Sequence, residues 1–261
     1  MGRTRHSLEI SLAVWKALFL REAVTRLSAG RAAWLWILME PLVHVVMLMA
    51  LFGFVYHRIV SGVDGAMFIM TGLLGFIAAR NTATRCIESI SANGALFAYR
   101  QVLPVDTVLV RAMLEGFLVL IATLVLLTGA ALAGYEILPA DPLQVILGFA
   151  GMWLCGLGVG LVLSVTAELV SELGRVARLI FLPLYFMSGV MYPASVVPQP
   201  YRNWLLLNPF MDGVDLIRSG FYAQFQGAPE ASMTYLFGFA VVTIFFGLAL
   251  HLRFAEKMVA R

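Results

Sequence analysis

The chain has 261 residues, of which 61% are hydrophobic and 13% are charged, and its mean hydropathy is +0.89. This composition excludes a soluble globular protein and predicts one all-α integral membrane domain over residues 1–261, because no stretch is polar enough for a second, soluble fold. The formal net charge is +3, so where the charges lie is more informative than their sum.

Residues 1–31 are basic and are expected to form an amphipathic cytoplasmic helix at the membrane interface. One helical face carries Leu8, Leu12, Trp15, Phe19 and Ala23, and Trp15 suits the depth of the lipid headgroups. A positively charged anchor that only orients the first span would explain the same pattern.

A first span is predicted over about 32–56, long enough to cross a hydrocarbon core of about 30 Å. It contains Glu40 and His44, one turn apart on the same helical face. A carboxylate at the bilayer centre costs about 2.5–3.5 kcal/mol, so Glu40 should face a partner or water. The pair either relays protons, as in a transporter, or makes a structural contact near the cytoplasmic end, which is the simpler interpretation.

The second span, predicted over 65–79, is short and should continue as helix beyond the membrane surface. A cytoplasmic segment over 85–105 follows, with a turn at Asn93-Gly94. Phe97 and Tyr99 are expected to be exposed there. Short helices with projecting aromatic side chains suit docking into a groove on a partner protein.

Three further spans are predicted over 108–133, 142–167 and 231–252. Near the start of the first of them, Arg111 and Glu115 lie at i, i+4 and are expected to neutralise each other. The next contains the small residues Gly156, Gly160 and Ser164, a pattern that lets helices approach closely, either within one subunit or between two copies.

The fifth of six predicted spans is the charge-free stretch 179–201, which prolines interrupt. Asn208-Pro209 then predicts a helix start, and apolar residues recur at helical spacing over 210–222. Two short, partly apolar helices after a break predict a re-entrant helical hairpin over 198–225 in the outer leaflet. The alternative is an ordinary extracellular loop with two surface helices.

Positive charges predict the orientation of these six spans. Fifteen of the eighteen Lys and Arg residues fall on the side that carries both termini. Both termini are therefore expected in the cytoplasm, and the hairpin on the outer face.

Little in the chain points to chemistry of its own. Its two lysines, Lys16 and Lys257, lie outside any phosphate-binding loop of the G-x-x-x-x-G-K-[ST] type, which excludes a P-loop ATPase. Neither a Cys/His cluster with metal-ligand spacing nor a nucleophile elbow occurs. An ion-coupled secondary transporter is the stronger rival class, with Glu40, His44, Arg111 and Glu115 as its intramembrane polar residues.

Several motifs carry a resemblance to a known family. SGVMYP, LNPF and DLIR, between residues 188 and 218, resemble the signature of ABC-2 type permeases. ALFLRE at 17–22, LWILMEP at 35–41, the stretch from Asn93 to Arg100, and PVDT with RAMLE at 104–115 are similar to the KpsM-type permeases of Gram-negative capsular polysaccharide export. Each motif is short, but their order and spacing cover nearly the whole chain.

The resemblance implies the transmembrane subunit of an ATP-driven exporter in the bacterial inner membrane, moving a lipid-linked acidic polysaccharide. It implies a homodimer, a separate nucleotide-binding subunit that holds ATP and Mg, a periplasmic polysaccharide co-polymerase and an outer-membrane export protein. Export of O-antigen or teichoic acid is the nearest alternative. The residues expected to couple the permease to the ATPase are Glu88, Asn93, Phe97, Tyr99 and Arg100.

A substrate channel is expected at the dimer interface, lined by the first, second and fifth spans. Its sugar-stacking candidates are aromatic, although each would equally serve packing: Trp34, Trp36, Tyr185, Phe186 and Tyr192. Three arginines could gather an anionic lipid end at the cytoplasmic mouth, or simply fix the orientation: Arg21, Arg26 and Arg31.

Overall fold

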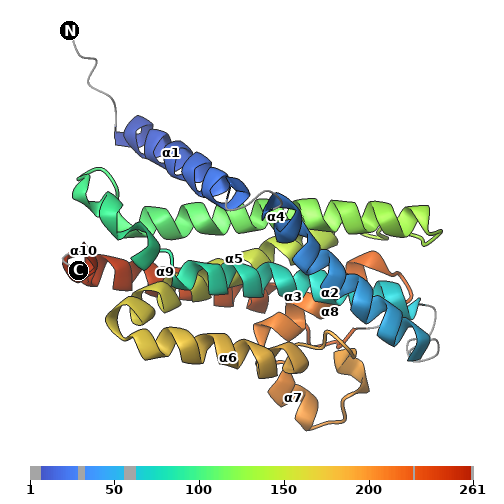
Figure 1. The fold of residues 1–261 in the computed structure, drawn as a ribbon. Coiled ribbons are helices and arrows are strands. Elements are labelled where there is room, and N and C mark those ends of the chain that lie inside the picture. Colours follow the sequence, from blue (N-terminus) through green and yellow to red (C-terminus); the bar gives the residue numbers. More distant parts are fainter. Residues whose placement is uncertain (1–6, 29–32, 56–62, 226, 260–261) are drawn as a thin grey trace.

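A computed structural model describes residues 7–28, 33–55, 63–225 and 227–259, apart from the side chains of 7–8, 27–28, 33–38, 40 and 53–55. Every regular element in these residues is helical, which confirms the predicted class (Figure 1). In chain order the elements are α1 (Ser7–Ser28), α2 (Ala33–Val55), α3 (Gly65–Ile87), η1 (Ser91–Ala98), α4 (Pro104–Leu132), α5 (Pro142–Leu169), α6 (Ser171–Met187), η2 (Ala194–Val196), α7 (Tyr201–Leu205), α8 (Pro209–Phe221), α9 (Met233–Arg253) and α10 (Ala255–Val259).

Four stretches of the described chain are long and apolar enough to cross a membrane: Gly65–Ile87, Pro104–Leu132, Pro142–Leu169 and Met233–Val259. They correspond to the second, third, fourth and sixth predicted spans. The second extends well beyond residue 79, as expected from the arginines that follow. The first predicted span corresponds to α2. Among the residues of α2 with described side chains, Pro41–Phe52 is apolar but shorter than the four stretches above.

The fifth predicted span has the wrong bounds. Helix α6 begins at Ser171, eight residues before the charge-free stretch, and its 17 residues continue through Pro183 to Met187. Gly189 then takes a φ of +66°, a left-handed conformation that glycine adopts without steric cost, and turns the chain away. Hydropathy alone missed the charged first turns of this helix.

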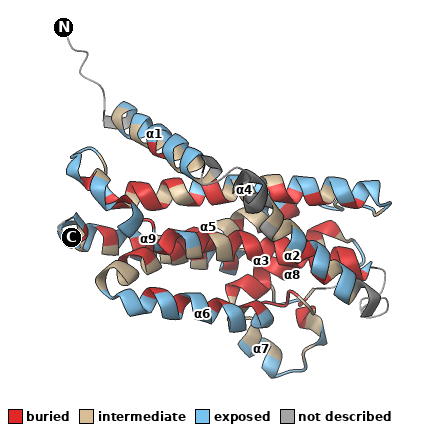
Figure 2. Ribbon diagram, in the orientation of Figure 1, coloured by how far each residue is buried: buried red, intermediate tan, exposed pale blue. Residues whose placement is uncertain are grey.

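Helix α5 lies at the centre of the bundle and packs against α3, α8 and α9. Glycines make these approaches possible: a Cβ on Gly156 would lie 2.5 Å from the carbonyl oxygen of Ala79, and one on Gly160 would lie 2.8 Å from Cβ of Cys86. The small residues of this helix are therefore used for packing within the subunit. Figure 2 shows the buried residues concentrated on α3, α5 and α8.

Helix α8 starts as its sequence predicts, because the Asn208 side chain accepts a hydrogen bond from the backbone N–H of Phe210. Nearly every residue of α8 is buried, with Phe210, Val214 and Ile217 in the main hydrophobic core. It is therefore not a surface helix, although the preceding α7 is exposed.

The two ends of the bundle are named after η1 and α7. The η1 end carries η1 and α10, which contact each other, and the α7 end is the opposite one, where α3 begins and α6 finishes (Figure 1).

Candidate functional site: a basic groove and a charged helix contact

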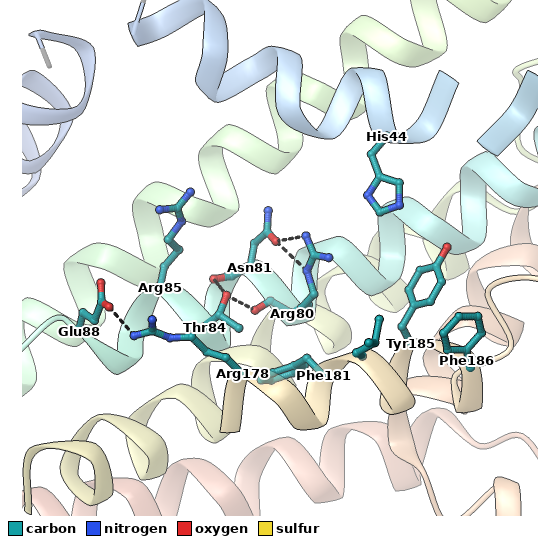
Figure 3. Close-up of a pocket in the computed structure, with 11 residues that line it drawn as sticks. His44, Arg80, Asn81, Thr84, Arg85, Glu88, Arg178, Phe181, Tyr185 and Phe186 are labelled. Atoms are coloured by element: carbon teal, nitrogen blue, oxygen red, sulfur yellow. Dashed lines mark hydrogen bonds and ion pairs between the residues drawn. The ribbon is translucent and has the colours of Figure 1, made fainter. Parts of the chain in front are cut away.

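A groove of about 480 Å³ lies between α2, α3 and α6. These are the helices that correspond to the first, second and fifth predicted spans. Figure 3 shows its walls. The lining residues are His44, Arg80, Asn81, Thr84, Arg85, Glu88, Arg178, Phe181, Leu182, Tyr185 and Phe186.

The half of the groove toward the η1 end is polar and basic. Asn81, Thr84, Arg85 and Glu88 recur at helical spacing and therefore share one face of α3. From α6, Arg178 reaches across the groove and forms an ion pair with Glu88 (Figure 3). With three arginines and one carboxylate in its wall, the groove favours an anionic occupant.

The other half of the groove is apolar and aromatic. Tyr185 packs edge-on against Phe186, with ring centroids 5.3 Å apart, and against Phe76, at 5.4 Å. The ring of His44 lies 6.2 Å from that of Tyr185. The groove thus combines a basic half with an apolar half, which suits an amphiphile that carries negative charge.

Of the predicted channel residues, the structure places Tyr185 and Phe186 in this groove. Tyr192 lies outside the lining and donates a hydrogen bond to the carbonyl oxygen of Phe186. Three other candidates, Arg31, Trp34 and Trp36, fall outside the described residues or side chains. The side chain of Glu40 also lies outside them.

Arg21 and Arg26 do not line the groove but bind α1 to other elements. Arg21 donates to the side-chain oxygen of Asn93 in η1 at 2.8 Å. Arg26 forms ion pairs with Glu22, at 3.2 Å, and with Glu115 of α4. Helix α1 is therefore attached to the bundle through its polar face.

The predicted pairing of Arg111 with Glu115 is wrong. Arg111 instead forms an ion pair with Glu22 of α1 at 2.9 Å, and Glu115 lies between Arg26 and Arg85, the latter at 3.9 Å. Spacing along one helix could not reveal this, because the partners come from α1 and α3. The result is a charged contact that joins three helices.

The segment predicted for coupling, 85–105, comprises the end of α3, η1, the turn after it and the start of α4. The expected exposure of Phe97 is wrong: it is 7% exposed and packs in a second core cluster with Ile90, Val108 and Met258. Tyr99, by contrast, is 67% exposed, and Arg100 beside it is also exposed.

The two other coupling candidates lie nearer the bundle. Asn93 is buried and donates to the carbonyl oxygen of Ser89 at 2.8 Å while it accepts from Arg21. Glu88 is exposed and lies at the mouth of the groove, at the point where α3 passes into η1.

Sequence reasoning missed the groove arginines Arg80, Arg85 and Arg178. On α3, the helical spacing of Asn81, Thr84, Arg85 and Glu88 is a sequence signal for the polar face that lines the groove. Arg178 lies just before the stretch 179–201 that was predicted as the fifth span, in the part of α6 that the prediction left out. Within the described residues, no three His, Cys, Asp or Glu side chains are grouped to hold a metal ion.

Comparison with known proteins gives consistent matches. The family model described as ABC-2 type transporter matches residues 13–222. The chain is 32% identical over 254 residues to the polysialic acid transport protein KpsM of Escherichia coli, covering 97% of this chain and 98% of that one.

Two further relatives carry names of the same kind. The capsule polysaccharide export inner-membrane protein CtrC of Neisseria meningitidis is 29% identical over 250 residues, which are 96% of this chain and 94% of the relative. The protein of the same description from Haemophilus influenzae, BexB, is 27% identical over 218 residues, 84% of this chain and 82% of the relative.

Proposed function

Because the chain belongs to the ABC-2 type transporter family, we propose that it is the transmembrane subunit of an ATP-driven exporter of lipid-linked capsular polysaccharide. Relatives that match over 84–97% of the chain are named for polysialic acid transport or capsule export. The polysaccharide crosses the inner membrane from the cytoplasm to the periplasm.

The observation that carries the proposal is the two-part groove between α2, α3 and α6. Its basic half suits the negative charges of an acidic polysaccharide, and its apolar half suits the lipid to which the polymer is attached. These helices are the spans expected to line the channel. Phe186, which is 52% exposed, offers an aromatic face for sugar stacking, whereas Tyr185 beside it is 8% exposed and supports it by packing.

In the proposed topology, α2 and α6 complete a set of six spans, and α7 with α8 form the re-entrant hairpin. The burial of α8 between α3 and α5 supports the hairpin. The η1 end faces the cytoplasm, which the excess of Lys and Arg on that side supports.

The permease works as a homodimer with a separate nucleotide-binding subunit on each copy. This chain has no ATPase motif, so ATP and Mg belong to the partner. Tyr99 and Arg100 are exposed at the η1 end and are the proposed contact with the ATPase. At the other face, a periplasmic co-polymerase and an outer-membrane export protein continue the route.

The test uses a double variant, Arg80→Gln with Arg178→Gln, which removes two positive charges from the basic half of the groove. Without these charges the anionic substrate binds less well, so we expect at least a tenfold loss of polysaccharide export into inverted vesicles that contain the partner ATPase. The matched control is Arg175→Gln, an exposed arginine on the same helix that pairs with Glu172 at 3.6 Å and does not line the groove. Export that is unchanged in the double variant, or independent of ATP, would overturn the proposal.

A further inference from the structure

The arginine that α6 contributes to the groove is held differently from the two that α3 contributes. Arg80 donates to the side-chain oxygen of the neighbouring asparagine at 3.0 and 3.2 Å. Arg85 lies 3.9 Å from the carboxylate of Glu115, which is buried outside the groove. Arg178 instead pairs with Glu88 from the opposite wall, the one carboxylate among the residues that line the groove (Figure 3). The partner of Arg178 is therefore part of the groove itself.

The pair of Glu88 and Arg178 is exposed and is held by a single contact. Its side chains are 61% and 45% exposed, and one guanidinium nitrogen meets one carboxylate oxygen. Among the residues that the structure describes, neither side chain has a second hydrogen-bond or ion-pair partner. A pair of this kind contributes little to stability, because water and dissolved ions compete for both of its groups.

A buried arginine elsewhere in the bundle shows what a fixed guanidinium requires. Arg218 of α8, at the α7 end, is 0% exposed. It donates to the backbone carbonyl oxygens of Phe68, at 3.1 and 3.2 Å, and of Gly189 and Val190, each at 2.6 Å. Its central carbon also lies 3.5 Å from the centre of the Phe68 ring, which adds a cation–π contact. Arg178 lacks such a cage, so another anion can replace its partner.

The walls of the groove do not depend on the exposed pair. Near it, α6 follows α5 after the single residue Val170, and Gly174 and Ala177 are buried. A Cβ on Gly174 would lie 3.0 Å from Cβ of Ala167 and 3.2 Å from Cγ2 of Ile87. This packing holds α6 against α5 and α3, so the ion pair can break while the helices stay in place.

We infer that Glu88 is an internal competitor for Arg178, which holds the guanidinium until an acidic group of the occupant replaces it. The Glu88 carboxylate offers the same chemistry as the acidic groups of the proposed substrate. Because it belongs to the same chain, it competes at a high effective concentration. An acidic occupant is therefore bound less tightly than the three arginines alone would bind it. The identity of that occupant rests on the proposed function.

Such an exchange suits a polymer that passes through the groove and does not stay in it. A site on a transport path has to bind its cargo well enough to admit it and weakly enough to release it. Between two acidic groups of the polymer, Glu88 returns to Arg178, so the arginine is not left as a bare charge. Removing the competitor should therefore strengthen binding and slow export, a combination that a loss of structure would not produce.

The first measurement is the binding of an anionic amphiphile to the full-length chain in neutral detergent, without the ATPase. The probe is hexadecyl galacturonide, which carries a single carboxylate, and hexadecyl galactoside is its neutral counterpart. Glu88→Gln should lower the Kd of the acidic probe about three- to fivefold, the size expected of an exposed ion pair, and leave that of the neutral probe unchanged. When Arg178→Gln is already present, adding Glu88→Gln should change the Kd by less than about twofold, because the group for which Glu88 competes is gone.

The second measurement is export into inverted vesicles that contain the partner ATPase. Glu88→Gln should lower the KM for the polysaccharide about threefold and the kcat at least about twofold. The matched control is Glu172→Gln, which removes an exposed carboxylate of α6 that pairs with Arg175 and does not line the groove. It should change neither quantity. Both variants should retain the same amount of ATPase, which separates this role from a contact with the partner.

The outcomes distinguish this inference from the function on which it rests. An unchanged or raised Kd of the acidic probe in Glu88→Gln, or a tightening that persists when Arg178 is absent, would overturn the inference alone. A kcat that does not fall with the KM would do the same. If the acidic probe bound no better than the neutral probe in every variant, the groove would not be an anion site, and the proposed function would fail as well.

Discussion

Two aromatic residues in the segment after α3 lie in different environments. Phe97 and Tyr99 are two positions apart and similar in size, yet one is buried in a core cluster and the other is exposed. Their sequence context is alike, because hydropathy and aromatic character do not say which side of a short 3-10 helix faces the protein. The docking assignment therefore rests on Tyr99 rather than on Phe97.

Replacing each of these residues with alanine should have different effects. Phe97→Ala removes a buried ring and should cost about 3–5 kcal/mol of stability, which lowers the melting temperature in detergent. Tyr99→Ala should leave the melting temperature unchanged but reduce the ATPase that co-purifies with the chain by at least tenfold. If Tyr99→Ala retained the ATPase fully, the proposed contact would be wrong.

At the scale of helices, local sequence signals located most elements but not their contacts. The start of α8 followed from Asn208-Pro209, and the close packing of α5 from its spaced small residues, because both depend on neighbours within a few positions. The burial of Arg218 could not be foreseen in this way, since its acceptor Phe68 lies 150 residues earlier in the chain. The start of α6 was missed because a helix can begin in charged residues before it reaches the bilayer.

Glycines on α5 and α4 should respond in opposite directions to alanine. Gly156→Ala places a methyl group 2.5 Å from a backbone oxygen of α3, so the two helices must separate and the melting temperature should fall. Gly129→Ala, on α4, meets no atom within 4 Å and should gain up to about 1 kcal/mol from helix propensity. A melting temperature for Gly156→Ala at or above that of the unchanged chain would contradict the close packing.

For the whole molecule, the attachment of α1 depends on charge. Helix α1 contacts the rest of the bundle through Arg21, Arg26 and Glu22, and also through Trp15, whose indole N–H donates to Asp106 of α4 at 2.8 Å. The sequence predicted an amphipathic helix at the interface but could not show that its polar residues pair with other helices.

Glu115→Gln should release the second half of α1. Glu115 is 3% exposed, and its removal leaves Arg26 and Arg85 without their shared carboxylate. Hydrogen exchange at residues 20–26 should become at least tenfold faster, whereas α5 and α8 should keep their protection. Glu172→Gln, which removes an exposed carboxylate on α6, is the control and should change neither region.

The position of Arg218 late in the chain also bears on how the protein is made. Ribosomes synthesise Phe68 150 residues before Arg218, whose guanidinium donates to the carbonyl oxygen of Phe68, so α3 leaves the ribosome before this link can form. Biogenesis must therefore keep a partly assembled bundle loose at one end until α8 emerges. A nascent chain that ends before Pro209 would lack this link altogether, and we expect it to be cleared by membrane proteases far faster than the full-length chain.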